Sequence, residues 1–170
     1  RELIGYIPWY FGLATNDHDA AWAKLSDESG FQAPWGMTTA ERSHPLFRSH
    51  GCCNCEWDGA IWPFASSQTL TALANRLQSE ESPTVNKEIY FQQLERYVES
   101  QYHRGRPYIG EYLDERDGAW LKGDQERSRY YNHSTYVDLI INGLVGIRPR
   151  ADRMIEINPL AESDGKLLVL

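Results

Sequence analysis

Two short segments of the sequence combine acidic and aromatic residues in a way that suits carbohydrate chemistry. In the first, Trp57 and Trp62 stand on either side of Asp58 and Gly59. Flat aromatic rings stack on the apolar C–H faces of sugars, and carboxylates accept hydrogen bonds from sugar hydroxyl groups. The pattern therefore predicts a sugar-binding segment. It also fits a hydrophobic staple at the start of a helix, with Asp58 as the cap.

The second segment, Gly110-Glu111-Tyr112, places a carboxylate between a glycine and an aromatic residue in a loop between two expected helices. A loop carboxylate can approach a water molecule without obstruction by a helix backbone, and packing against Tyr108 or Tyr112 would desolvate it and tune its pKa, which suits a general base. The alternative is an exposed loop carboxylate. We expect this simpler environment for Asp114, Glu115 and Asp117, which follow closely.

Two further groups are candidates for binding. Tyr131 and His133 stand at the start of an expected apolar helix, where the histidine is either functional or a structural residue with satisfied hydrogen bonds. Trp35 lies in a long aromatic loop, and such loops are uncommon in compact domains unless they are functional. For Glu41 and Arg42 nearby, we expect a structural ion pair or loop hydrogen bonds.

Composition and missing motifs argue against several other functions. The 170 residues include 17 basic and 24 acidic side chains, and the net charge of -7 disfavours nucleic-acid binding and a polybasic membrane anchor. The sequence has no apolar run of about 18 residues, which a transmembrane helix would need. It contains no G-x-S-x-G, P-loop, G-x-G-x-x-G or H-E-x-x-H motif. Cys52-Cys53-Asn54-Cys55 holds a single Cys-x-x-Cys pair, so we expect no metal site.

Apolar periodicity predicts three main helices that position these segments. They span about residues 60–78, 84–103 and 134–146, and Thr84 is a possible cap of the second. A shorter helix is expected at 17–26 with Asp17 as its cap, and 106–129 is a long loop that can hold a short hairpin. The apolar stripes expected in the core include Phe64, Val98, Tyr102, Val137 and Ile141.

The periodicity changes to two after residue 150. This change predicts strands at 154–157 and 166–170 and a domain boundary near residue 150. The sequence opens without methionine and ends within an apolar run, so we expect it to be a piece of a longer protein.

Taken together, these segments resemble the six-hairpin glycosidases, in particular the group with a mannosylglycerate-hydrolase-like, glycoside hydrolase family 63-like catalytic domain. The resemblance covers nearly the whole chain. It rests on the order and spacing of Glu56-Trp57-Asp58-Gly59-Ala60-Ile61-Trp62-Pro63, of Ser67 to Asn75, of Gly110-Glu111-Tyr112-Leu113-Asp114 with Gly118, and of Tyr131-Asn132-His133-Ser134-Thr135 leading to Gly143-Leu144-Val145-Gly146 and Arg148-Pro149-Arg150.

The resemblance implies a mainly α fold that is part of an (α/α)6 toroid, with the active site where the inner helices begin. Residues 1–150 would be the C-terminal portion of the glycosidase domain, and residues 151–170 the first strands of a truncated β-sandwich. It also implies inverting hydrolysis, in which one carboxylic acid protonates the leaving oxygen while a carboxylate activates water. The general base falls on Glu111, although Gly110 and Leu113 depart from the family pattern.

The same resemblance implies a sugar subsite lined by Trp57, Asp58 and Trp62, to which the aromatic loops add Trp35, Tyr131 and His133. Asp58 stands where relatives carry arginine, and Ala60 where they carry proline. No segment matches the family's general acid. We therefore expect the acid in the remainder of the same polypeptide, and no hydrolysis by these 170 residues alone. The implied partner is a carbohydrate, and no cofactor is needed because water is the nucleophile.

Two other functions stay open. One is a carbohydrate-binding toroid without catalysis, and the other is a different toroid enzyme such as a sugar phosphorylase or epimerase. A phosphorylase would need a phosphate site, and the sequence offers no candidate cluster of basic residues for it beyond Arg104 and Arg106. An epimerase would need paired histidines, and only His133 is well placed. A Glu111 that faces the same cleft as the two tryptophans would favour hydrolysis.

Overall fold

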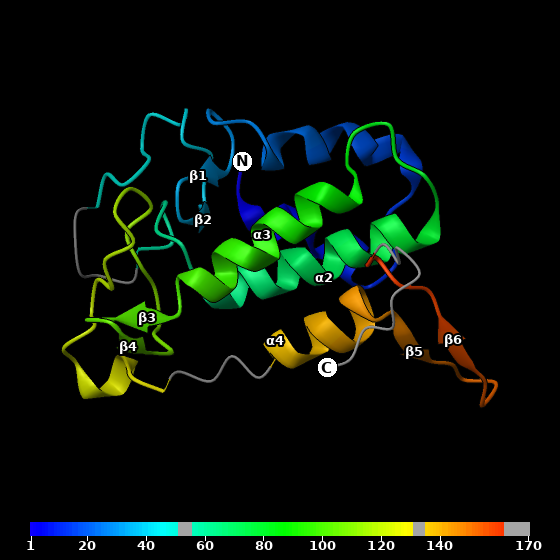
Figure 1. Cartoon of the computed structure of the whole chain (residues 1–170). Helices are drawn as coiled ribbons and strands as arrows, with labels where there is room; N and C mark the ends of the chain where they lie inside the picture. The colour runs from blue at the N-terminus through cyan, green and yellow to red at the C-terminus, as the bar shows by residue number, and fades with distance from the viewer. Residues whose placement is uncertain (51–55, 131–134, 162–170) are drawn as a thin grey trace.

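The structure, a computed structural model, describes residues 1–50, 56–130 and 135–161, which are mainly helical (Figure 1). The two longest helices, α2 (Pro63–Ser79) and α3 (Lys87–Glu99), pack side by side at the centre. The remaining helical elements are short, and η marks a 3-10 helix or, for η4, a π-helix. They are η1 (Leu3–Tyr6), α1 (Ile7–Tyr10), η2 (Asn16–Leu25), η3 (Glu126–Ser128), α4 (Thr135–Asp138) and η4 (Leu139–Leu144). Within the described ranges, none of these helices combines the length and apolar character that crossing a membrane requires.

Helix α2 is the centre of the core and contacts α1, α3 and η4. Its buried alanines, Ala65, Ala72 and Ala74, let neighbouring elements approach closely, while Leu70 and Leu73 are completely buried. The helix predicted over 60–78 is confirmed. It begins at Pro63. A proline is well tolerated in the first turn, because the N–H group that it lacks would have no partner within the helix.

Aromatic residues of the N-terminal segment form another part of the core. The rings of Tyr6 and Trp22 stack with centroids 4.4 Å apart, and Trp9 meets Trp22 edge-on at 5.2 Å. Trp22 belongs to η2, which occupies the region predicted as a helix over 17–26. It is a 3-10 helix, and Thr15 rather than Asp17 is at its N-cap.

Helix α3 is shorter at both ends than the predicted helix over 84–103. It begins at Lys87 because the Asn86 side chain caps it, accepting a hydrogen bond from the Ile89 N–H at 3.1 Å. Thr84 instead belongs to the preceding turn, where its N–H donates to Ser82 Oγ. The chain leaves α3 after Glu99 and enters a hairpin.

The helix predicted over 134–146 is present in a modified form. Four α-helical residues in α4 continue into the π-helical η4, where the N–H of Val145 donates to the carbonyl of Ile140 at 2.8 Å. The cause is a buried tyrosine, because Tyr90 Oη donates to the Leu139 carbonyl at 2.9 Å and lies where a side chain on Gly143 would sit. An inserted side chain of this kind widens a helical turn.

Three two-stranded antiparallel sheets complete the described fold. They pair β1 (Gln32–Ala33) with β2 (Gly36–Met37), β3 (Tyr102–His103) with β4 (Arg106–Pro107), and β5 (Ile147–Pro149) with β6 (Ile155–Ile157). The strand expected at 154–157 is thus confirmed, and the predicted boundary at residue 150 falls inside its hairpin. The strand expected at 166–170 lies outside the described residues.

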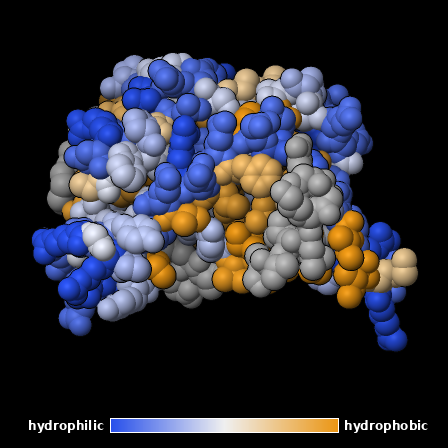
Figure 2. All heavy atoms as spheres, viewed as in Figure 1, coloured by the Kyte–Doolittle hydropathy of each residue, from blue (hydrophilic) through white to orange (hydrophobic). Residues whose placement is uncertain are grey.

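Several residues predicted for the core are exposed at the surface of this chain. They are Phe64, Val98, Tyr102, Val137 and Ile141, of which Val137 is 56% exposed. Figure 2 shows hydrophobic residues at the surface over α4 and the β5–β6 hairpin. The five residues were expected in the core because of their helical spacing, but no described element covers their side chains.

Candidate functional site

Backbone pairing joins the segment before α2 to the loop that carries Glu111. Ile61 and Leu113 exchange two hydrogen bonds of 3.0 Å, and Leu113 also forms a β-bridge with Trp120. The loop over 106–129 therefore has more regular structure than the sequence predicts. The pairing brings together the two segments that sequence analysis selected independently.

A stack of three aromatic rings reinforces this junction. Trp57 and Trp62 stack with centroids 4.2 Å apart, and Trp62 stacks on Tyr112 at 4.7 Å. Trp62 and Tyr112 are buried, whereas Trp57 is 45% exposed. Trp57 is thus the member of the stack with an accessible ring, and Trp62 supports it from behind while donating a hydrogen bond from Nε1 to the Glu56 carbonyl.

Trp57 forms one wall of a surface groove with a volume of about 530 Å³. Phe64, Gln68 and Thr69 of α2 line it from one side, and residues of η1 and Phe11 line it from another. The groove offers apolar surface beside a few polar groups, which is the usual character of a small-molecule site. Glu111 is not among the residues that line this groove.

Glu111 is half-buried, and its carboxylate has a defined partner. Ser128 Oγ donates a hydrogen bond to Glu111 Oε2 at 2.8 Å. The residue before Glu111 must be small, because a side chain at Gly110 would overlap the rings of Tyr108 and Trp120. This crowding is the physical reason for a glycine at the position where the sequence departs from the family pattern.

Asp114 and Glu115 correct the expectation of exposed loop carboxylates, since each is only 4% exposed. The Arg48 side chain lies between these two carboxylates and the carboxylate of Glu56. Its guanidinium forms ion pairs with Glu56, with Asp114 at 3.3 Å and with Glu115 at 3.6 Å. Hydrogen bonds from Arg116 are the main reason that the pKa of Asp114 lies below its usual value, and the charge of Arg48 adds to that effect.

Asp58 is bound by a histidine and does not cap α2, whose N-cap position is Trp62. Its Oδ2 atom accepts a hydrogen bond from the His50 N–H at 3.0 Å and lies 2.9 Å from His50 Nδ1. Burial opposes ionisation of Asp58, but these contacts with His50 outweigh it, and the pKa of Asp58 lies below its usual value. Asp58 is therefore an ionised group next to Trp57.

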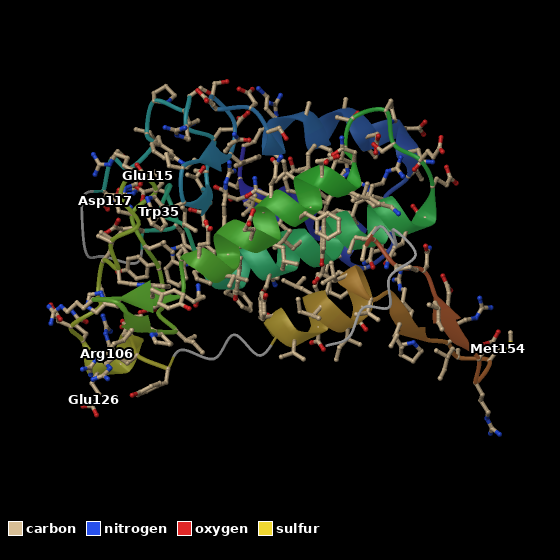
Figure 3. The ribbon with its side chains drawn as sticks, in the orientation of Figure 1. Trp35, Arg106, Glu115, Asp117, Glu126 and Met154 are labelled. Carbon is tan, nitrogen blue, oxygen red and sulfur yellow. The ribbon has the colours of Figure 1, made fainter. Side chains whose placement is uncertain are left out.

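Trp35 lies at the turn of the β1–β2 hairpin and is 36% exposed. Figure 3 shows it beside Glu115 and Asp117 at one end of the molecule. The backbone of Gly118 packs against the face of its indole ring, so close that a side chain there would lie 2.4 Å from a ring atom. Trp35 therefore touches the loop of Glu111 from a third segment of the chain.

The other predicted residues divide into two groups. Arg42 donates hydrogen bonds to the backbone carbonyls of Glu28 and Gln32, and Glu41 accepts one from the Arg1 guanidinium at 2.9 Å, which are the structural contacts expected. Tyr131, His133 and the three cysteines lie outside the described residues. Within the described part, no group of three His, Cys, Asp or Glu side chains is arranged to hold a metal ion.

Sequence reasoning missed Arg48 and Ser128. Arg48 and Ser128 lie far along the chain from the carboxylates that they contact, and neither belongs to a recognisable motif. Tyr108, by contrast, was expected to be a possible neighbour of Glu111, and its ring borders Gly110, the residue before Glu111.

Comparison with known proteins finds a family model and solved structures that resemble this chain. A family model described as the mannosylglycerate hydrolase MGH1-like glycoside hydrolase domain matches residues 1–134. A solved structure named "Sialidase" is 64% identical and superimposes with a TM-score of 0.92 over 96% of this chain. The chain spans only 15% of the length of that protein. No curated protein matches the chain.

Proposed function

The chain belongs to the mannosylglycerate hydrolase MGH1-like glycoside hydrolase domain family, and we propose that Glu111 is the general base of an inverting glycosidase. On this proposal the chain is part of an (α/α)6 toroid. Its 170 residues supply the base and one side of the sugar site, and the remainder of the same polypeptide supplies the general acid.

The observation that supports the proposal most is the junction between the segments of Glu111 and Trp57. The Ile61–Leu113 backbone pair and the stack of Trp62 on Tyr112 fix these segments relative to each other. A base and a sugar-binding ring must keep a constant relationship if water is to attack one anomeric carbon repeatedly. Two segments joined by backbone and ring contacts meet that requirement.

In the proposed reaction, the Glu111 carboxylate removes a proton from a water molecule. The water oxygen bonds to the anomeric carbon while the bond from that carbon to the leaving oxygen breaks. A carboxylic acid on the opposite face of the sugar gives its proton to the leaving oxygen, so the anomeric configuration inverts. An inverting pair of carboxyl groups is separated by roughly 6.5–9.5 Å, which leaves room for the water.

The sugar-binding roles follow from exposure and chemistry. The accessible ring of Trp57 would stack on a sugar, and ionised Asp58 beside it would accept hydrogen bonds from hydroxyl groups. Buried Trp62 would act by holding Trp57 in place. We assign Trp35, Tyr131 and His133 to the same sugar site as further binding groups. The name of the solved relative makes a sialic-acid-bearing glycan a candidate substrate beside neutral glycosides.

The test uses the whole protein that contains this chain. Hydrolysis is measured with 4-nitrophenyl mannosides, glucosides, galactosides and a sialoside, and ¹H NMR identifies the first anomer released from the best substrate. Glu111→Gln should lower kcat on the order of 10³-fold, while Glu126→Gln, an exposed glutamate on η3, should leave it unchanged. Retained configuration or an active Glu111→Gln variant would refute the assignment.

The non-catalytic alternative makes a different prediction in the same experiment. No glycoside of the panel would be hydrolysed, yet a sugar would bind, and Trp57→Ala would abolish the heat of binding. Detection of hydrolysis that depends on Glu111 rejects this alternative.

A further inference from the structure

We propose that Ser128 is a positioning residue for the general base, an inference that rests on the proposed role of Glu111. Ser128 is 1% exposed, and its hydroxyl donates to Glu111 Oε2 at 2.8 Å. Among the described residues, it is the one hydrogen-bond donor to this carboxylate. A neutral donor can orient a base and leave its negative charge intact, whereas a cation at the same place would neutralise that charge.

The backbone around Ser128 fixes where its hydroxyl points. Ser128 ends η3, and its N–H donates to the Gln125 carbonyl at 3.0 Å. The Ser128 carbonyl accepts a hydrogen bond from Tyr108 Oη at 3.3 Å. The Tyr108 hydroxyl also lies 3.2 Å from the Gly123 carbonyl. Tyr108 therefore holds the turn of Ser128 from the side of the loop that leads to Glu111.

The position of the Glu111 backbone is set by the same tyrosine. The ring of Tyr108 packs on Trp120 with centroids 5.3 Å apart, and both rings border Gly110. Tyr108 thus contacts the residue that precedes Glu111 and the residue that binds its carboxylate. One side chain relates the main chain of the base to the donor that orients it.

The hydrogen bond has a directional consequence for catalysis. Ser128 binds Oε2, and no described residue donates to the other oxygen, Oε1, so we assign Oε1 as the atom that takes a proton from water. A carboxylate free to rotate would present either oxygen at many angles, and misorientation of a base lowers the rate without changing how the sugar binds. Removal of the hydroxyl should therefore reduce kcat and leave KM nearly constant.

The test separates the hydroxyl group from the volume of the side chain. Thr and Val have the same shape, so Ser128→Thr and Ser128→Val differ in the donor alone. In the whole protein, with the 4-nitrophenyl glycoside that is hydrolysed fastest, we expect kcat of Ser128→Val to be about tenfold below that of Ser128→Thr, with KM of the two within about twofold. Thr71→Val, which deletes a hydroxyl that donates to the Ser67 carbonyl within α2, should leave both constants unchanged.

Each outcome separates this inference from the proposed function. Equal kcat for Ser128→Thr and Ser128→Val, with an inactive Glu111→Gln, would overturn the positioning role and leave the base assigned. An active Glu111→Gln would overturn both. If both Ser128 variants unfold, as thermal unfolding would reveal, Ser128→Ala takes their place, and a kcat of Ser128→Ala equal to that of the unmodified protein counts against the role of the hydroxyl.

Discussion

The rings of Trp62 and Tyr112 stack with centroids 4.7 Å apart and an angle of 14° between their planes. This contact connects the segment that leads into α2 with the loop that carries Glu111. Both side chains are buried, so the pair contributes through removal of apolar area from water and through ring geometry. The stack therefore links the stability of the junction to the position of the proposed base.

Tyr112→Leu should lower the free energy of unfolding by about 2 kcal/mol, because leucine fills part of the space but cannot stack on Trp62. Tyr112→Phe keeps the ring and should cost less than about 1 kcal/mol. Urea denaturation measures both values. A loss for Tyr112→Phe as large as that for Tyr112→Leu would show that the stack is not the source of the effect.

Arg48 is the cation shared by Glu56, Asp114 and Glu115, and its side chain is 17% exposed. Arg48→Met should destabilise the protein by about 3 kcal/mol, because it leaves buried carboxylates without their central partner. Arg48→Lys keeps the charge and should restore part of this loss. Arg116→Met, at a side chain that is 72% exposed, should have a smaller effect. Chemical denaturation at pH 7 ranks the variants by their loss of unfolding free energy. A larger loss for Arg116→Met than for Arg48→Met would contradict the prediction.

Asp19 predicts a pH dependence at the other end of α2. Burial alone would raise the pKa of Asp19, but hydrogen bonds from Arg76 and Ser82 outweigh it and hold that pKa below its usual value. A lowered pKa in the folded state adds stability above the ordinary value of about 3.9, and this stability is lost as the pH falls through the lower folded value.

Asp19→Asn should therefore cost about 3 kcal/mol at pH 7, and the difference from the unmodified protein should shrink as the pH falls below about 4. Asp17→Asn is the matched control, because Asp17 is an exposed carboxylate on the same helix η2. Thermal unfolding over a pH series measures the effect. A difference that stays constant down to pH 2 would show that ionisation of Asp19 is not its cause.

The sequence could predict the helices whose periodicity is strong, and it indicated Glu111 and Trp57 as candidates whose segments the structure joins. It could not place the start of α3, because Thr84 and Asn86 are both good capping residues and Ser82 decides between them by binding the Thr84 N–H. The π-helical geometry of η4 was equally unpredictable, because it depends on Tyr90, a residue of another helix, α3.

The environment of the acidic residues was the least predictable part of the site. Asp114 and Glu115 have the local sequence of exposed loop residues, and they are buried because Arg48 comes from far earlier in the chain. The Ser128–Glu111 hydrogen bond likewise joins two polar residues that are distant in the sequence. Contacts between polar residues at long sequence separation carry no periodicity, so pattern analysis has no means of detecting them.

Gly118 offers a final prediction, on the contact between the Glu111 loop and Trp35. Its φ of +72° is a left-handed conformation, and an added side chain would lie 2.4 Å from the Trp35 ring. Gly105 has nearly the same φ, +75°, but open space around it. Gly105→Ala should cost about 1 kcal/mol for backbone conformation alone, and Gly118→Ala should cost at least about 2 kcal/mol because the indole must also move. Denaturation of both variants, with tryptophan fluorescence as a second signal, compares them directly, and equal losses would mean that Trp35 yields without cost.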